Sequence, residues 1–241
     1  MVLAAGIGSR LGPLTRDCPK ALLEIGGRPM LEIVIRRLIE AGVSEIIVNV
    51  FHLAEQIAEF IEKRGRFGIR IELSREDQLL DTGGGLKKAA WFFDDGEPFF
   101  LHNSDVLTDL DLARMLRFHK AHPALATLAV QRRESARALL FGADGALKGW
   151  KSGPQATRWA SRPDPKAEAL AFAGIHVISP RLLERLSETG AFPVHQAYLR
   201  LASEGERIQA FPTDGCYWTD IGTEAKLSEA RARAQDPKPF H

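Results

Sequence analysis

Cysteine is scarce in this sequence, and neither sign of charge is in surplus. Only two cysteines occur among 241 residues, Cys18 and Cys216, and their spacing matches no metal motif. We therefore expect neither a disulfide framework nor a zinc site, and the expected compartment is the reducing cytoplasm. The formal net charge is only +1, from 32 Lys and Arg against 31 Asp and Glu. A nucleic-acid partner is not expected from that balance.

Long hydrophobic runs are also missing. No apolar stretch approaches the roughly 20 residues that a membrane-spanning helix needs, and the N-terminus has the pattern of a strand rather than of a signal peptide. A membrane is therefore not an expected partner. The composition, 45% hydrophobic and 26% charged, is that of a globular protein with one sizeable core.

The first motif is a pair of glycines directly after a short apolar run. Val2–Ala5 is followed by Gly6 and Gly8, which predicts a buried strand that enters a tight loop. Because glycine has no Cβ, successive N–H groups in such a loop can form a concave anion site. Arg10 and Lys20 would add two cations. An ordinary turn is the alternative, since Gly-x-Gly alone is a weak signal.

Two well-known phosphate loops do not fit this stretch. A dinucleotide-binding fingerprint would have its third glycine at position 11, where Leu11 stands. A P-loop would need Gly-Lys-Ser or Gly-Lys-Thr, and the sequence has neither here. A redox enzyme on a dinucleotide-binding sheet is therefore disfavoured.

Strand and helix patterns alternate along the first 130 residues. Apolar runs predict strands at 45–50, 69–73 and 98–101, and helical spacing predicts helices at 29–41, 53–64 and 86–93. This alternation predicts an α/β fold, Rossmann-like, with a mostly parallel sheet covered by helices on both faces. Ligands bind at the carboxyl ends of such strands, where we place loops at 6–20, 81–85 and 103–105.

From about residue 130 the pattern changes to short strands and turns. Strands are predicted at 124–131, 169–178, 207–211 and 216–220, and helices at 180–186, 194–203 and 223–234. We expect one domain over 1–241, made of a core (1–130), a β-rich lid (131–215) and a closing segment (216–241).

Two aspartates stand where they could bind a metal. Asp105 follows an apolar strand, so its carboxylate would project at the edge of the sheet, and Mg²⁺ on phosphates needs only one or two protein carboxylates. Its alternative role is to cap a turn. Asp220 precedes a predicted helix, where it could instead act as a cap or a helix N-terminal acid near Thr223.

Two longer strings are more specific than these single signals. Leu3 to Lys20 has the form Leu-Ala-Ala-Gly-x-Gly-x-Arg-Leu-x-Pro-Leu-Thr-x-x-x-Pro-Lys. It resembles the signature of the sugar-1-phosphate nucleotidylyltransferases, also called nucleotide-sugar pyrophosphorylases. Trp218–Thr223 resembles the Trp-x-Asp-x-Gly-Thr motif of the same family. The chain looks most like short bacterial members, such as N-acetylmuramic acid 1-phosphate uridylyltransferases and mannose-1-phosphate guanylyltransferase-like proteins.

The resemblance implies a role for each motif. Arg10 and Lys20 would be catalytic, by neutralising phosphates, and Asp105 and Asp220 would share a magnesium ion. The family's usual Gly-Asp pair is here Ser104-Asp105, which leaves the carboxylate in place. The implied nucleotide-binding residues are Leu3, Ala4, Ala5, Gly6, Gly8, Arg10, Gly83, Gly84 and Asn103.

The core would then bind the nucleotide and the lid the sugar, which Gly174 would let approach closely. The glycines at 83–85 would leave bare backbone against the nucleobase, whereas a flexible loop followed by the start of a helix is the alternative. For Asn103, the alternative to a nucleotide contact is an Asx turn at the end of the strand. We expect His176 to be structural. Four basic residues could bind an acidic sugar or its phosphate, although solvated surface charges are the favoured interpretation for each: Arg132, Arg133, Arg137 and Lys151.

The implied reaction joins a sugar 1-phosphate to a nucleoside triphosphate, UTP or GTP favoured, and gives an NDP-sugar and pyrophosphate. A cytidylyltransferase for a phospho-alcohol such as phosphocholine is a close alternative. A non-catalytic nucleotide-binding module is a further one, although it would not need two metal carboxylates. The sequence does not determine the base or the sugar. A homodimer is expected, although the sequence does not determine the oligomeric state.

Overall fold

The computed structural model describes residues 1–153 and 156–234, and they form two compact units. Unit 1 comprises Met1–Leu79, His102–Ala113 and the described residues from Cys216 onward. Unit 2 comprises Leu80–Leu101 and Arg114–Gly215. The sequence-based division at 130 and 215 stays a prediction, and residues 235–241 of its last segment lie outside the described residues.

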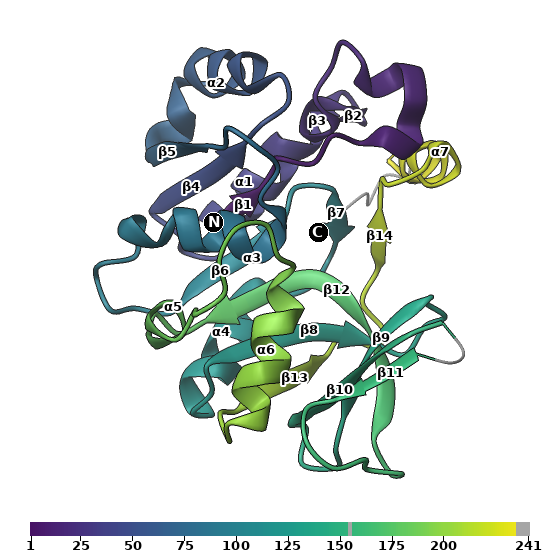
Figure 1. Cartoon of the computed structure of the whole chain (residues 1–241). Coiled ribbons are helices and arrows are strands. Elements are labelled where there is room, and N and C mark those ends of the chain that lie inside the picture. The colour runs from purple at the N-terminus through teal and green to yellow at the C-terminus, as the bar shows by residue number, and fades with distance from the viewer. Residues whose placement is uncertain (154–155, 235–241) are drawn as a thin grey trace. The chain divides into compact units, whose positions relative to one another are not determined.

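Unit 1 is built on parallel strands (Figure 1). β1 (Val2–Leu3) pairs with β4 (Glu45–Val50) on one side and with β6 (Phe99–Asn103) on the other, and β4 pairs with β5 (Arg70–Arg75). All three pairings are parallel, with Val2 opposite both Val48 and His102. The β-branched run of β4 suits this position, because five of its six residues are buried.

The helices of unit 1 follow their apolar periodicity. In α1 (Met30–Glu40) the buried face includes Leu31, Val34, Ile35 and Leu38, at the three- and four-residue spacing of one helical stripe. The chain turns at Gly42, whose φ of 93° suits glycine. In α2 (Ala54–Lys63) the buried residues are Ile57 and Ile61. Both helices are confirmed where the sequence predicted them.

Shorter elements complete unit 1. They are η1 (Ser9–Thr15), η2 (Lys20–Leu22), β2 (Glu24–Ile25), β3 (Arg28–Pro29), η3 (Gly65–Gly68), β7 (Val106–Thr108), β14 (Trp218–Asp220) and α7 (Glu224–Arg233). β7 and β14 pair antiparallel. One core cluster joins Leu11 of η1, Met30, Leu107 of β7, Ile221 and Leu227 of α7. Packing therefore ties the first loop to β7, to the residue that follows β14 and to α7.

Unit 2 carries the β-rich half of the chain. Its strands are β8 (Ala126–Gln131), β9 (Arg137–Phe141), β10 (Leu147–Ser152), β11 (Ala156–Trp159), β12 (Glu168–Ile178) and β13 (Ile208–Pro212). They pair in the order β13-β8-β12-β9-β10-β11, and only β13–β8 is parallel. The helices are α3 (Asp81–Lys88), η4 (Ala90–Phe92), α4 (Leu112–Ala121, which starts in unit 1), α5 (Arg181–Glu184) and α6 (Val194–Ser203). α6 packs against α3 and β10 (Figure 1).

The predicted fold class is confirmed: the protein is α/β, with a largely parallel central sheet and flanking helices. One local expectation is wrong. Residues 81–85 are not an open loop, because Asp81–Lys88 forms α3 and buries Gly83, Gly84 and Gly85. A Cβ on Gly83 would lie 2.2 Å from the Phe192 ring, and one on Gly84 would lie 2.5 Å from the Gly190 carbonyl oxygen. These glycines allow close packing of a helix.

Candidate functional site

The loop after β1 has one open glycine and one crowded glycine. A Cβ on Gly6 would meet nothing within 4 Å, so its backbone is accessible to a ligand. Gly8 has φ of 72°, and a Cβ there would lie 2.8 Å from Thr15 Cγ2. The Thr15 hydroxyl donates to the Gly8 carbonyl oxygen at 3.0 Å. Gly8 therefore fixes the loop's fold while Gly6 presents its backbone.

A buried hydrogen-bond chain holds the start of this loop. The Ala4 N–H donates to Asn49 Oδ1 at 2.8 Å, and Asn49 Nδ2 donates to Glu76 Oε1 at 2.7 Å. Both Asn49 and Glu76 are buried, as are Ala4 and Ala5. Neither Asn49 nor Glu76 was predicted from the sequence to be a functional residue. A polar residue between Val48 and Val50 of an otherwise apolar strand was the available signal.

Lys20 and Asp105 meet at the carboxyl end of the parallel strands. The Lys20 ammonium donates to Asp105 Oδ2 and forms an ion pair with it. Gly8 lies beside Lys20, since a Cβ on Gly8 would be 3.3 Å from Lys20 Cβ. The Ser104 N–H donates to the Leu3 carbonyl oxygen at 3.0 Å. The departure from Gly-Asp at Ser104 thus leaves Asp105 at the edge beside β1.

Leu3 and Asn103 are register partners in the β1–β6 pair. Asn103 is the last residue of β6 and is half-buried. It therefore belongs to the same edge as the glycine loop, and the sequence-based strand at 98–101 ended two residues too early.

Asp220 lies at the end of β14 in a turn that Gly222 makes possible. Asp220 Oδ1 accepts the Gly222 N–H at 2.8 Å, and Asp220 Oδ2 accepts from the Lys226 ammonium. Burial alone would raise the pKa of Asp220, but these two hydrogen bonds and the charges of Lys226 and Lys20 hold it below its usual value. A Cβ on Gly222 would lie 2.9 Å from Arg10 Nη2, so the Arg10 guanidinium rests against this turn.

The β7–β14 pair brings the two carboxylates to one place. Asp220 is opposite Val106, the residue after Asp105, and the Ile221 N–H donates to the Asp105 carbonyl oxygen at 3.0 Å. Within residues 1–153 and 156–234, no three His, Cys, Asp or Glu side chains gather as a self-sufficient metal cage. Two carboxylates beside a glycine loop nevertheless suit Mg²⁺, which needs only one or two carboxylates from a protein when phosphates and water supply its other ligands.

The remaining predicted ligand contacts belong to unit 2. Gly83 and Gly84 form the first turn of α3, where the N–H groups of both donate to the Phe192 carbonyl oxygen, at 2.9 and 3.3 Å. Gly174 lies in β12 at a register shift, with φ of 79°, a conformation that favours glycine. That bulge explains the glycine without a ligand, and a sugar contact there stays a prediction.

The basic residues of unit 2 have different surroundings. Arg132 forms ion pairs with Glu168 and Asp214 on the surface. Arg133 donates to the Phe172 carbonyl oxygen at 2.9 Å. His176 is buried, and its Nδ1 is 2.9 Å from the Tyr198 hydroxyl, which supports its structural role.

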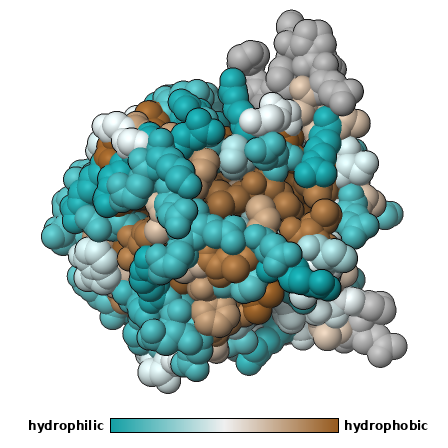
Figure 2. All heavy atoms as spheres, turned by 90° about the horizontal axis from the view of Figure 1, so that it is seen from above, coloured by the Kyte–Doolittle hydropathy of each residue, from teal (hydrophilic) through white to brown (hydrophobic). Residues whose placement is uncertain are grey.

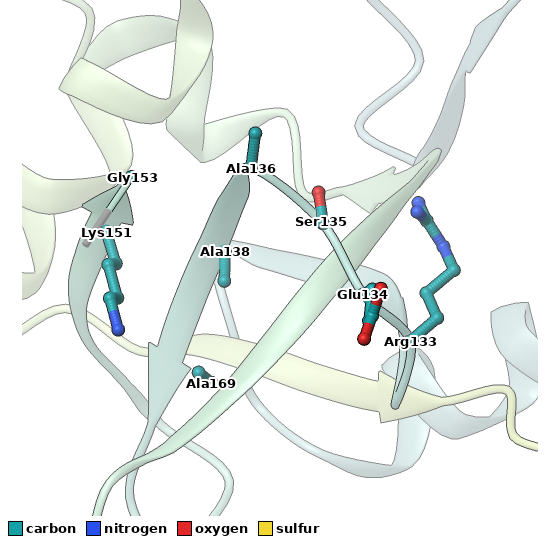
Figure 3. A pocket seen from close by; sticks show the side chains of 8 residues that line it. All are labelled: Arg133, Glu134, Ser135, Ala136, Ala138, Lys151, Gly153 and Ala169. Carbon is teal, nitrogen blue, oxygen red and sulfur yellow. The ribbon is translucent and has the colours of Figure 1, made fainter.

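An open pocket of about 1040 Å³ lies within unit 2. Figure 3 shows Arg133 and Lys151 on opposite sides of it, with Glu134 between them. Its lining comes from β9, β10, β12 and the loop before β9: Arg133, Glu134, Ser135, Ala136, Ala138, Lys151, Gly153 and Ala169. Two cations, one carboxylate and one hydroxyl therefore border a space large enough for a small polar ligand.

The face drawn in Figure 2 is mainly polar. Hydrophilic residues cover most of the face in Figure 2, with apolar residues visible between them. Within the described residues, no helix has both the length and the apolar character needed to cross a membrane.

Comparison with known proteins agrees with this geometry. A model of the nucleotidyl transferase family matches residues 1–236. Mannose-1-phosphate guanyltransferase beta-A of Xenopus laevis is 31% identical over 224 residues, which is 92% of this chain and 60% of that protein. The chain thus spans about 60% of the length of the curated relatives it matches.

Solved structures share the fold at lower identity. HddC from Yersinia pseudotuberculosis, complexed with GMP-PN, has a TM-score of 0.76 at 22% identity, with 96% of this chain and 97% of that one covered. UDP-glucose pyrophosphorylase from Acinetobacter baumannii has a TM-score of 0.76 at 20% identity, with coverages of 98% and 94%. The match of the family model over almost the whole sequence, together with the loop and carboxylates described above, shows that this chain belongs to the nucleotidyl transferase family.

Proposed function

We propose that this protein transfers a nucleotidyl group from a nucleoside triphosphate to a sugar 1-phosphate, giving an NDP-sugar and pyrophosphate. One observation carries the proposal: in unit 1 Lys20, next to Gly8 of the glycine loop, pairs with Asp105, and Arg10 of the same loop lies against the turn of Asp220. Two cations and two carboxylates beside a glycine loop suit a polyphosphate and its metal. The name of the Xenopus relative favours GTP and mannose 1-phosphate as the first pair to test, with UTP as the other favoured nucleotide.

The chemistry requires no protein nucleophile. An oxygen of the sugar phosphate attacks the α-phosphorus, a new P–O bond forms, and the bond from the α-phosphorus to the bridging oxygen breaks. Pyrophosphate leaves with that electron pair. A phosphate monoester is already an anion at neutral pH, so catalysis consists of alignment and charge neutralisation.

The chain's own residues would divide this work. Backbone N–H groups around Gly6 and Gly8 would bind phosphate oxygens, and Arg10 and Lys20 would neutralise the charge that develops on the leaving pyrophosphate. Leu3, Ala4, Ala5 and Asn103 would position the nucleoside at the same edge. Asp105 and Asp220 would hold Mg²⁺, which when bound supplies charge neutralisation to the phosphate oxygens.

The contacts to the base and the sugar are the less direct part of the proposal. We place the nucleobase at the start of α3, at Gly83 and Gly84, and the sugar near Gly174. The pocket bordered by Lys151 and Arg133 supports a phosphorylated sugar as the ligand of unit 2, because both cations can pair with phosphate.

Compartment and assembly are further parts of the proposal. We expect the enzyme to work in the cytoplasm, since two distant cysteines suit a reducing compartment. A homodimer is proposed as well, and size-exclusion chromatography with light scattering would test it.

Pyrophosphate release tests the proposed reaction. UTP, dTTP, GTP, CTP and ATP are each combined with Mg²⁺ and with a panel of sugar 1-phosphates and phosphocholine, for the wild type and for Asp105→Ala. We expect release with one nucleotide and one sugar phosphate, and none from the variant. Release with CTP and phosphocholine would instead establish the phospho-alcohol cytidylyltransferase. Nucleotide binding without release from any pair would leave only a nucleotide-binding module.

A further inference from the structure

Lys226 is a third cation at the carboxylate pair. It lies in the first turn of α7, where its N–H donates to the Thr223 hydroxyl at 3.4 Å. Its side chain passes over the Trp218 ring, with Nζ 5.5 Å from the ring centroid, and pairs with Asp220. Each of the two proposed metal ligands is thus held by one lysine, Asp105 by Lys20 and Asp220 by Lys226.

The two oxygens of Asp220 differ in their partners. Oδ1 accepts the Gly222 N–H and so helps to form the turn after β14. Oδ2 accepts from the Lys226 ammonium. Oδ2 is the oxygen that is not tied into the turn, so a cation that binds there approaches the Lys226 ammonium and competes with it for the same oxygen.

If a cation displaces Lys226 from Asp220, the Lys226 ammonium needs another anion to pair with. Its side chain is 41% exposed and carries a flexible four-carbon stem, so the ammonium can move several ångströms. Next to a divalent cation, Lys20 and Arg10 it would be repelled by like charges. The anions that enter this site under the proposed function are the phosphate groups of the substrates.

We propose that Lys226 is a phosphate-binding residue that exchanges partners: it neutralises Asp220 in the metal-free protein and binds a substrate phosphate once a divalent cation occupies Asp220 Oδ2. This inference rests on the proposed function. It assigns Lys226 two opposing effects, weaker metal binding to the free protein and tighter phosphate binding to the metal-loaded protein.

Mn²⁺ binding to the free protein tests the first effect without any reaction. We compare the wild type with Lys226→Met, Lys226→Gln and Lys226→Arg by electron paramagnetic resonance of unbound Mn²⁺. The matched control is Lys63→Met, which removes a lysine from the exposed Lys63–Glu59 ion pair of α2. Both neutral variants should bind Mn²⁺ up to about fivefold more tightly, the range of a partly exposed ion pair. Lys226→Arg and Lys63→Met should match the wild type.

Separate titrations of the Mg²⁺-loaded protein with inorganic pyrophosphate and with mannose 1-phosphate test the second effect. Both neutral variants should lose about tenfold in affinity for at least one of them, as expected for a charge-assisted hydrogen bond. The ligand affected identifies the phosphate that Lys226 binds. Unchanged Mn²⁺ affinity, or unchanged affinity for both phosphates, would overturn the proposal. Failure of the wild type to release pyrophosphate would instead count against the proposed function, and the Mn²⁺ comparison would still be decisive.

Discussion

Arg10 and Lys20 come from one short stretch of sequence but lie against different parts of the site. Lys20 pairs with Asp105, and the Arg10 guanidinium rests against the Asp220–Gly222 turn. Each cation is thus held near the proposed path of the phosphates before substrate binds, which is the preorganisation that electrostatic catalysis requires.

Replacing either cation should therefore lower the rate of the chemical step. For Arg10→Ala and Lys20→Ala we expect kcat/KM to fall by about 10²–10³-fold, the usual effect of removing one charge-stabilising contact in a transition state. Arg16→Ala, which removes an exposed arginine a few residues away, should change it little. Steady-state kinetics of pyrophosphate release measures all three, and equal activity of the three variants would contradict the assignment.

The Ala4–Asn49–Glu76 chain predicts a different kinetic effect. Asn49→Ala leaves the Ala4 N–H and the Glu76 carboxylate without this partner in a buried place, which costs about 1–3 kcal/mol of stability. The first loop should then be less well positioned, so that KM for the nucleotide rises more than kcat falls. Glu76→Gln keeps an acceptor for Asn49 and should have the milder effect. A loss of stability with unchanged KM would show that these hydrogen bonds only support the fold and do not position the loop.

At the scale of elements, helices and strands could be predicted from the sequence, but the contacts between them could not. Helical spacing identified α1 and α2, each of which buries one stripe of residues, and apolar runs identified β4 and β12, most of whose residues are buried. Residues 83–85 were mistaken for a loop because the groups that Gly83 and Gly84 pack against, the Phe192 ring and the Gly190 carbonyl, lie more than a hundred residues later in the sequence. Lys226 and Asn49 escaped notice for the same reason, since their partners come from other elements.

The packing of α3 makes a prediction of its own. Gly83→Ala would drive a methyl group into the Phe192 ring, at 2.2 Å before relaxation. We expect about 1–3 kcal/mol of destabilisation, as for other overpacked cores. Gly96→Ala is the control: its φ is 75° but a Cβ there meets open space, so only backbone strain of about 1 kcal/mol applies. Urea unfolding measures both, and equal losses would contradict the close packing.

For the whole molecule, two buried histidines couple stability to pH. Burial lowers the pKa of His102 and of His119 from 6.5 to about 4. Both therefore stay neutral in the folded protein at pH 5, whereas the unfolded chain takes up protons below pH 6.5. The stability of the folded protein is therefore unaffected by these two groups above pH 6.5, and it decreases as the pH falls from 6.5 toward 4.

As the pH falls through this window, each histidine should lower the free energy of unfolding by up to about 1.4 kcal/mol per pH unit. Denaturant unfolding from pH 7 to pH 4 measures the slope, and nuclear magnetic resonance of the His119 ring identifies its source. A ring that titrates near pH 6.5 in the folded protein would contradict the assignment.

The division into two units also bears on how the protein is made. The chain passes between units at 79/80, 101/102, 113/114 and 215/216, so neither unit is a continuous segment that could be cut out or folded by itself. On the ribosome, β1 and the glycine loop emerge first, but β14 and α7, which complete unit 1, emerge after the whole of unit 2. Vectorial synthesis thus delays the pairing of β7, which follows Asp105, with β14, which ends at Asp220, until both units are almost entirely translated, so the proposed pair of metal ligands is completed last.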